Sequence, residues 1–427
     1  MKVMVIGTGG REHTLVWKIA QSPRVEKIYC PGGNAGIAQL ADIRMPEQGE
    51  NFPGYIEFCR KEGIDLTVVG PEAPLAEGIV DAFQDAGLRI FGPTKAAARI
   101  EASKYFAKEV MLSARVPTAF AQGFSSSADA IRYLDTKRFP LVIKADGIAA
   151  GKGVIIAQTR DEAENAIYSL MNDKELGDAG NRILIEDYLS GEEASLLAFT
   201  DGETILPMDS AQDHKPIGEG DTGPNTGGMG AYCPAPVVTP DIQQKCLEEV
   251  FKPTIAELKK RGILYQGVLY AGLMITDTGP RVLEFNCRFG DPENQAILPR
   301  LKTDLITVME AVIEKRLTDV SLEWRKESAV CVVIASGGYP GKYEKGKIIT
   351  GLDRIRESAN QIIFHAGTRL DGQNVLTNGG RVLGVTALAD TLPETIEKAY
   401  DLVSRITFDK MYYRKDIAQK ALKRLKK

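Results

Sequence analysis

The sequence has few of the residues that build metal sites or disulfide frameworks. Its 427 residues include three histidines, which lie far apart at positions 13, 214 and 365. The six cysteines are also dispersed, with no Cys-x-x-Cys pair. This pattern argues against a zinc site and against a small disulfide scaffold, and it is typical of reduced thiols. The sequence therefore predicts a cytoplasmic protein.

Long apolar runs and a strong positive charge are missing as well. No apolar run approaches the ~20 residues that a membrane span requires, and the start MKVMVIGTGG is typical of a strand broken by glycines rather than of a signal peptide. The net charge of −4 argues against a broad basic surface for nucleic acid. We therefore expect no membrane and no nucleic-acid partner. Any phosphorylated ligand must be held by local lysines, arginines and backbone amides.

The order of apolar segments predicts several domains. Between residues 2 and 101, short strand-like segments alternate with helical ones, which predicts a doubly wound parallel sheet of α/β class. From about residue 117 the pattern changes to strands joined by a glycine-rich turn, which predicts an α+β unit with antiparallel strands. After a linker near 320–328, further strands and a closing helix from about Leu392 predict a small last domain.

A long segment rich in turn-forming residues, 207–236, separates these units. Glycine, proline, aspartate and asparagine crowd it, so we expect a loop without regular structure. Loops of that length are uncommon in compact domains and are usually functional or disordered. Met229, Ala231 and Tyr232 offer apolar anchors, which argues against a disordered linker. The segment is therefore expected to bind a ligand.

The stretch 282–293, VLEFNCRFGDPE, carries the strongest chemical signal. Side chains alternate across a strand, so Glu284 and Asn286 share one face while Phe285 and Cys287 share the other. A carboxylate and an amide oxygen suit Mg²⁺, which needs only one or two protein carboxylates when phosphates supply further oxygens. A salt bridge between Glu284 and Arg288 is the alternative. The spacing alone does not separate the two.

Two glycine-rich turns indicate phosphate binding. Residues 7–13 follow the first strand at the start of a helix, where backbone amides attract anions. The acidic residue that a dinucleotide fold places on the ribose is missing, which favours a phosphorylated small molecule; a purely structural turn is the alternative. In the second turn, Lys144 on a strand precedes a glycine hairpin at 147–153, as in protein kinases. A mobile surface hairpin with a solvated lysine is the alternative there.

In combination, these motifs closely resemble the glycinamide ribonucleotide synthetase (phosphoribosylamine–glycine ligase) family of the ATP-grasp superfamily. The resemblance runs nearly end to end, through GTGGREH, VGPEAPL, FGPTKAAARIEASKYFAKEVM, VIKADGIAAGKGV, AQDHK, GPNTGGMGAY, EFNCRFGDPENQ and SGGYPGKYEKG. The segments 223–232 and 288–295 are the most specific. Two small departures are Glu219, where an aspartate is usual, and Ile148, where a leucine is common.

The resemblance implies the domains and the reaction. It implies a Rossmann-like substrate domain at 1–102, an ATP-grasp domain at 103–323 with a small lid subdomain at about 120–190, and a C-terminal domain at 324–427. The implied reaction joins glycine to 5-phosphoribosylamine with ATP as co-substrate, through glycyl phosphate, in purine biosynthesis. Mg²⁺ or Mn²⁺ is the implied metal, and a monomer is the expected state.

The resemblance also implies residue roles. The ATP-binding set is Lys104, Lys144, Gly147, Gly151, Lys152 and Gly153 for the phosphates, Glu186, Asp187, Tyr188 and Leu189 for adenine, and Glu193 for the ribose. The metal ligands are Glu284 and Asn286, and the residues that act on the transferring phosphoryl group are Arg288 and Lys144. The substrate-binding set is Asp213 and Asp291 for the glycine ammonium, and Gly9, Gly10, Arg11 and Glu72 for phosphoribosylamine.

Three other functions are weighed against this one. Another ATP-grasp carboxylate–amine ligase would share Lys144 and Glu284, but it should lack the pair GPNTGGMGAY and RFGDPE. A nicotinamide oxidoreductase is disfavoured because the chain lacks the carboxylate that would bind the ribose of the dinucleotide. A non-catalytic nucleotide sensor would have lost Glu284 or Asn286, and both are present.

Overall fold

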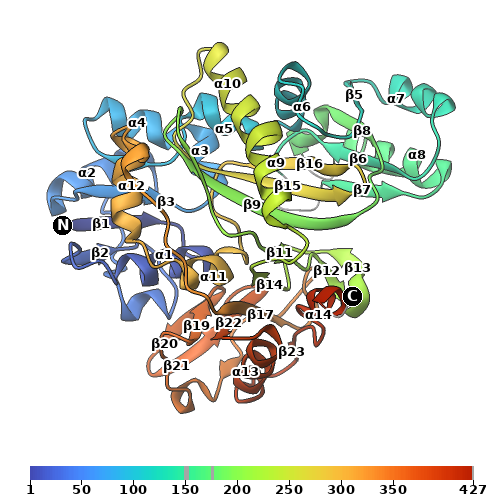
Figure 1. Ribbon diagram of the computed structural model, residues 1–427. Helices are drawn as coiled ribbons and strands as arrows, with labels where there is room; N and C mark the ends of the chain where they lie inside the picture. The colour runs from blue at the N-terminus through green and yellow to red at the C-terminus, as the bar shows by residue number, and fades with distance from the viewer. Residues whose placement is uncertain (149–152, 175–176, 426–427) are drawn as a thin grey trace.

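The computed structural model describes residues 1–148, 153–174 and 177–425, arranged as three lobes (Figure 1). The N-terminal lobe contains a parallel sheet of four strands, as predicted from the alternating pattern. Its order is β2 (Lys27–Tyr29), β1 (Lys2–Ile6), β3 (Leu66–Val69) and β4 (Ile90–Phe91). The helices of this lobe are α1 (Gly10–Ile19), α2 (Phe52–Glu62), α3 (Glu72–Glu77), α4 (Ile79–Asp85) and α5 (Lys95–Ala102). The four strands are almost entirely buried, because helices cover both faces of a doubly wound sheet.

A late helix completes the N-terminal core. Helix α12 (Leu305–Ile313) is nearly all apolar and begins after Asp304, whose side chain accepts a hydrogen bond from the Ile306 amide at 3.1 Å. It packs beside β4 and shares one hydrophobic core with Val3 and Val68. In Figure 1 this orange helix accordingly lies among blue elements. Residues beyond 300 therefore help to fix the sheet that begins the chain.

Two antiparallel sheets form the central lobe, as expected from about residue 117 onward. The first has the order β5 (Ala121–Phe124), β8 (Ile183–Asp187), β6 (Leu141–Ala145) and β7 (Val154–Ala157). The second has the order β10 (Ile205–Pro207), β9 (Glu192–Thr200), β15 (Gly267–Thr276) and β16 (Gly279–Asn286). The accompanying helices are α6 (Lys104–Ser113), α7 (Ser127–Tyr133), α8 (Arg160–Met171), α9 (Pro240–Cys246) and α10 (Lys252–Lys260). Helix α11 (Asn294–Ile297) instead packs against α1 of the N-terminal lobe.

The prediction of an irregular loop at 207–236 is wrong. Besides the end of β10, the segment contains four short strands, β11 (Gln212–Asp213), β12 (Pro216–Gly218), β13 (Thr222–Asn225) and β14 (Gly230–Cys233). Strand β14 pairs with β17 (Ser328–Ser336), which lies about a hundred residues later. Strands this short carry no periodicity, and their hydrogen-bond partners come from a distant part of the chain. The sequence pattern within the segment could not reveal them.

The C-terminal lobe is built on the sheet that β14 joins. Its order is β11, β14, β17, β22 (Arg381–Ala389) and β19 (Gln361–His365), with β23 (Met411–Tyr412) paired to β17. A small sheet of β18 (Ile348–Ile349), β21 (Asn374–Thr377) and β20 (Thr368–Asp371) lies beside it. Helix α13 (Leu392–Ser404) starts where predicted, but it does not close the chain, since β23 and α14 (Gln419–Leu425) follow. In the described part of the chain, no helix is long and apolar enough to cross a membrane.

Candidate active site

A cavity of about 420 Å³ lies where the lobes meet, and most of the predicted site residues line it. These are Arg11, Glu72, Lys104, Lys144, Gly147, Gly153, Glu186, Asp187, Tyr188, Leu189, Glu193, Asp213, Glu284, Asn286, Arg288 and Asp291. Gly9 and Gly10 are not part of its lining, and Gly151 and Lys152 lie outside the described residues. The structure therefore brings together residues that are almost 300 positions apart in the sequence.

Two buried lysines share one buried carboxylate at the wall formed by the first sheet. Lys144 on β6 has its Nζ 3.0 Å from Oε2 of Glu186, and Lys108 Nζ lies 3.2 Å from the other carboxylate oxygen. Lys144 also donates a hydrogen bond to the Leu283 carbonyl at 2.9 Å. Because Lys144 is buried, the alternative of a solvated surface lysine is wrong. Two ammonium groups on one carboxylate leave a positive charge that faces the cavity.

A third lysine, Lys104, adds to this positive wall. It is the first residue of α6, whose N-cap is Ser103, and it donates to the Gly147 carbonyl at 2.9 Å. Burial lowers the pKa of Lys104, and the nearby Lys144 lowers it further, while Glu284 opposes the shift. Bringing the negative charge of a phosphate to this wall would relieve the repulsion among the lysines.

Glu284 and Asn286 lie side by side on β16 as expected, with Phe285 and Cys287 buried in the core behind them. The alternative of a Glu284–Arg288 salt bridge is wrong. Arg288 instead pairs with two acids from the N-terminal lobe, Glu72 (3.2 Å) and Glu101 (2.9 Å). The chain turns toward that lobe after β16 ends, and this turn directs Arg288 away from the strand.

The electrostatic surroundings keep Glu284 ionised. Burial alone would raise the pKa of this carboxyl, but Lys215, Lys144, Lys104 and Arg288 outweigh burial and hold the pKa below its usual value. Within the described ranges, no group of three or more histidine, cysteine or acidic side chains is arranged so that it could hold a metal ion by itself. A divalent cation at Glu284 and Asn286 would therefore need oxygens from a bound phosphate. That donor set suits Mg²⁺ and not a closed protein cage.

Lys215 is a cavity residue to which the sequence analysis assigned no role. Its Nζ lies 3.2 Å from a Glu193 carboxylate oxygen and 3.7 Å from one of Glu284. Glu193 raises the pKa of Lys215, burial opposes this, and Glu284 and Asp213 add to the rise. The lysine thus connects the expected ribose residue to the expected metal ligand. The motif AQDHK contained the signal, since it places a lysine two residues after Asp213.

A pair of carboxylates, Asp213 and Glu293, also lines the cavity. Glu293, which sequence reasoning also missed, is buried and accepts hydrogen bonds from the hydroxyls of Tyr270 (2.5 Å) and Ser195 (3.1 Å). Asp213 lies close enough for the negative charge of Glu293 to act on its carboxyl group. Burial raises the pKa of Asp213 well above its usual value, and the charge of Glu293 raises it further. An ammonium group bound here would compensate this unfavourable pair.

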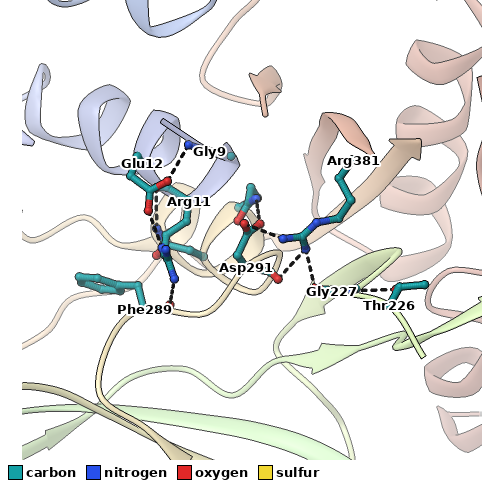
Figure 2. A network of polar contacts seen from close by, with 12 residues as sticks. Gly9, Arg11, Glu12, Thr226, Gly227, Phe289, Asp291 and Arg381 are labelled. Atoms are coloured by element: carbon teal, nitrogen blue, oxygen red, sulfur yellow. Dashed lines mark hydrogen bonds and ion pairs between the residues drawn. The ribbon is translucent and has the colours of Figure 1, made fainter. Parts of the chain in front are cut away.

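The N-terminal glycine turn is arranged differently from the expected phosphate loop. The carboxylate of Glu12 accepts a hydrogen bond from the Gly9 amide at 2.7 Å and one from Arg11 Nε at 2.6 Å (Figure 2). Gly10 is buried, and a Cβ there would lie 2.7 Å from the amide nitrogen of Gln295. The amide of Gly9 is therefore already hydrogen-bonded within the turn, and Gly10 permits close packing against Gln295.

Arg11 and Glu72, the other two residues expected at phosphoribosylamine, do reach the cavity. Their closest charged atoms are 3.5 Å apart. Burial would raise the pKa of Glu72, but the charges of Arg288 and then Arg11 outweigh it and lower the pKa to about 2. This end of the cavity is consequently a network of ionised side chains from the N-terminal and central lobes.

The fold and the cavity together define an ATP-grasp enzyme. Two antiparallel sheets carry a lysine-rich wall on one side and a carboxylate–amide pair on the other. The family model described as "Phosphoribosylglycinamide synthetase, ATP-grasp (A) domain" matches residues 102–294. The N-domain and C-domain models of the same synthetase match residues 1–101 and 329–420. The chain belongs to the phosphoribosylglycinamide synthetase family.

Relatives of known sequence agree over nearly the whole chain. Proteins named phosphoribosylamine–glycine ligase are 51% identical in Escherichia coli K12 over 427 residues and 49% identical in Vibrio cholerae over 426 residues. Each alignment covers 99% of this chain and 99% of the relative. The resemblance seen in the motifs is confirmed by these full-length matches.

Solved structures agree with this placement. The crystal structure of phosphoribosylamine–glycine ligase from Thermotoga maritima is 32% identical, with a TM-score of 0.86, and covers 98% of this chain and 100% of its own. A biotin carboxylase from Campylobacter jejuni is only 14% identical, with a TM-score of 0.75 over 97% of this chain and 93% of its own. The second likeness shows the fold alone.

Proposed function

We propose that the cavity between the lobes is the site at which this chain joins glycine to 5-phosphoribosylamine, through a glycyl phosphate intermediate. The overall activity follows from the family: the chain is an ATP-dependent ligase of purine biosynthesis. The glycine carboxylate attacks the γ-phosphate of ATP and forms glycyl phosphate and ADP. The amine of phosphoribosylamine then attacks the acyl carbon and releases phosphate. Because an acyl phosphate hydrolyses in water, an enclosed cavity suits this chemistry.

ATP is proposed to lie between the two sheets of the central lobe. Lys104 and Lys144 hold the phosphates, and Gly147, Gly151, Lys152 and Gly153 are proposed to contact them as well. Adenine contacts the segment Glu186–Leu189, and Glu193 accepts hydrogen bonds from the ribose hydroxyls. The positive wall of buried lysines supports this placement, since phosphoryl transfer depends mainly on positioning and on charge neutralisation.

A divalent cation, Mg²⁺ or Mn²⁺, is proposed at Glu284 and Asn286. When bound, it would neutralise charge on the phosphate oxygens. Glu284 is kept ionised by its surroundings and is thus ready to accept a cation. Arg288 lines the same cavity and can stabilise negative charge on the transferring phosphoryl group.

Asp213 is the stronger of the two candidates for the glycine ammonium. Both oxygens of Asp291 already accept hydrogen bonds, from Gln295 at 2.7 Å and from Arg381 at 2.8 Å. Among the described residues, Asp213 accepts a hydrogen bond only from the His214 amide, at 2.6 Å, and its ionisation is disfavoured by burial and by Glu293. A substrate ammonium would make that ionisation favourable.

Phosphoribosylamine is proposed to enter from the N-terminal lobe. Arg11 and Glu72 offer the groups that line the cavity there, and Gly9 and Gly10 begin the adjacent helix. The proposed domain boundaries remain 1–102, 103–323 and 324–427, with the lid at about 120–190, and the proposed state is a monomer. A cytoplasmic location is proposed because all six cysteines are free thiols.

The observation that carries this proposal is the meeting of the lysine wall, Glu284 and Asp213 around one cavity. The test is ADP release with Mg²⁺–ATP, glycine and phosphoribosylamine made in situ, omitting each in turn. We expect full turnover only with all three substrates. ADP formation that is equally fast without glycine, or with alanine in its place, would overturn the assignment.

A further inference from the structure

Arg381, the first residue of β22, extends from the C-terminal lobe into the cavity. Its guanidinium contacts two segments of the central lobe, as Figure 2 shows. Nη2 donates to the Asp291 carboxylate at 2.8 Å, and Nη1 donates to the backbone carbonyls of Asp291 (2.7 Å) and Gly227. The side chain is only 20% exposed. One arginine thus joins three parts of the chain that are up to 154 residues apart.

The contact with Gly227 is close. A Cβ at this position would lie 3.0 Å from the Arg381 Cζ and 3.1 Å from its Nη2, so the guanidinium lies directly against the backbone. The Gly227 amide donates to the Tyr339 hydroxyl at 3.0 Å. Both polar backbone groups of Gly227 are therefore held by side chains of the C-terminal lobe.

The same arrangement encloses Asp213. At Gly228, whose φ is +111°, a Cβ would lie 2.7 Å from an Asp213 carboxylate oxygen and 2.3 Å from Pro292. The turn 226–228 is thus packed between Asp213 and the Asp291–Pro292 turn. Arg381 donates hydrogen bonds to both of these turns, at Gly227 and at Asp291. Arg381 therefore bonds to two segments that lie next to the Asp213 carboxylate.

We propose that Arg381 is a positioning residue through which the C-terminal lobe shapes the glycine site. By holding Gly227 and Asp291 in place, it limits the space beside Asp213 to the size of the ammonium group and keeps the Asp213 carboxylate directed at that group. This inference rests on the proposed binding of the glycine ammonium at Asp213. It assigns to the C-terminal lobe a direct effect on amino-acid recognition, while ATP binding depends on the central lobe.

The test compares Arg381→Lys and Arg381→Ala with a matched control, Arg325→Lys. Lysine cannot reproduce the fork of donors that joins three acceptors. Arg325 is also largely buried near the C-terminal lobe and donates to the Ala359 carbonyl at 2.9 Å and to Glu327, but it is not part of the cavity lining. The readouts are KM for each substrate, kcat, and the rise in unfolding temperature that glycine produces without turnover.

We expect Arg381→Lys to raise the KM for glycine by about tenfold or more, as for the loss of one hydrogen bond to a charged group. The KM for ATP should stay within about twofold, and Arg325→Lys should change neither constant. Millimolar methylguanidinium should partly restore the glycine KM of Arg381→Ala and have no effect on Arg325→Lys. The glycine-dependent rise in unfolding temperature should shrink in both Arg381 variants.

Two results would overturn the inference. A glycine KM within twofold of wild type in Arg381→Lys, or an equal rise in the KM of every substrate, would reduce Arg381 to a structural contact. Asp213→Asn, measured in the same assays, distinguishes a failure of the proposed glycine site from a failure of the role of Arg381. An unchanged glycine KM in Asp213→Asn would refute the ammonium placement itself, whereas an effect of Asp213→Asn without one of Arg381→Lys would refute only the role of Arg381.

Discussion

Replacing Lys144 by methionine tests the proposed ATP site in a single step. Methionine keeps most of the side-chain volume and removes the ammonium group. In the structure, this group contacts Glu186 at 3.0 Å and the Leu283 carbonyl at 2.9 Å. Lys108 remains 3.2 Å from Glu186, so the carboxylate keeps one partner. The change is therefore local, with one carbonyl left without its donor.

The expected magnitude follows from the charge that is lost. One hydrogen bond to a charged group contributes about 1.5–3 kcal/mol, and two unit charges about 4 Å apart interact by about 4 kcal/mol at an effective dielectric constant near 20. We therefore expect kcat/KM for ATP to fall between about 10-fold and 1,000-fold. The KM for glycine should change by less than about twofold, because Lys144 contacts Glu186 and the Leu283 carbonyl and not Asp213, where glycine is proposed to bind. Steady-state ADP release with each substrate varied in turn measures both constants.

Lys259→Met is the control. Lys259 on α10 of the central lobe has its Nζ 2.7 Å from a Glu203 carboxylate oxygen, and neither residue lines the cavity. This variant should keep both constants near wild type. If Lys144→Met retained a normal turnover number and a normal KM for ATP, the assignment of Lys144 and its hairpin to the phosphates would be wrong.

Two further predictions concern the carboxylates. Glu284→Gln should raise the Mg²⁺ concentration for half-maximal activity by about tenfold or more. It should also lower the unfolding temperature, since three lysines and Arg288 lose their common counter-charge. A magnesium titration with an unchanged midpoint would contradict the metal assignment. The pKa of Asp213 is raised in the folded protein, so the protonated carboxyl stabilises the folded state. This stabilisation is fully present below the usual pKa of 3.8 and is lost as the pH rises through the folded-state pKa. Asp213→Asn should therefore unfold at a higher temperature than wild type at neutral pH, with a difference that disappears near pH 4, and should lose glycine binding. Equal unfolding temperatures at both pH values would refute that reading of Asp213.

The sequence predicted much of the fold because local patterns determine it. Alternation placed Glu284 and Asn286 on one face of β16 and Phe285 on the other, and burial of Phe285 enforces that register. The parallel N-terminal sheet followed from its alternating strands and helices. The strands within 207–236 did not follow, because β14 is four residues long and is stabilised by pairing with β17.

The candidate site was predictable where motifs carried it and unpredictable where tertiary contacts did. Lys144 and Glu284 stand in recognisable motifs and lie in one cavity. Arg288 was expected near Glu284, but its partners Glu72 and Glu101 come from the N-terminal lobe. Arg381 lies in an ordinary strand sequence, and only its contacts with Asp291 and Gly227 reveal its role.

Oxygen transfer from glycine to phosphate tests most directly the central claim, that glycyl phosphate forms in this cavity. Glycine labelled with ¹⁸O in both carboxylate oxygens is incubated with the protein, Mg²⁺–ATP and phosphoribosylamine, and the released phosphate is examined by mass spectrometry. If the carboxylate attacks the γ-phosphate, the oxygen that joins them leaves with phosphorus. Each molecule of phosphate should then carry one ¹⁸O atom, and the amide product should retain the other. Unlabelled phosphate released at the rate of ligation would contradict the proposed intermediate.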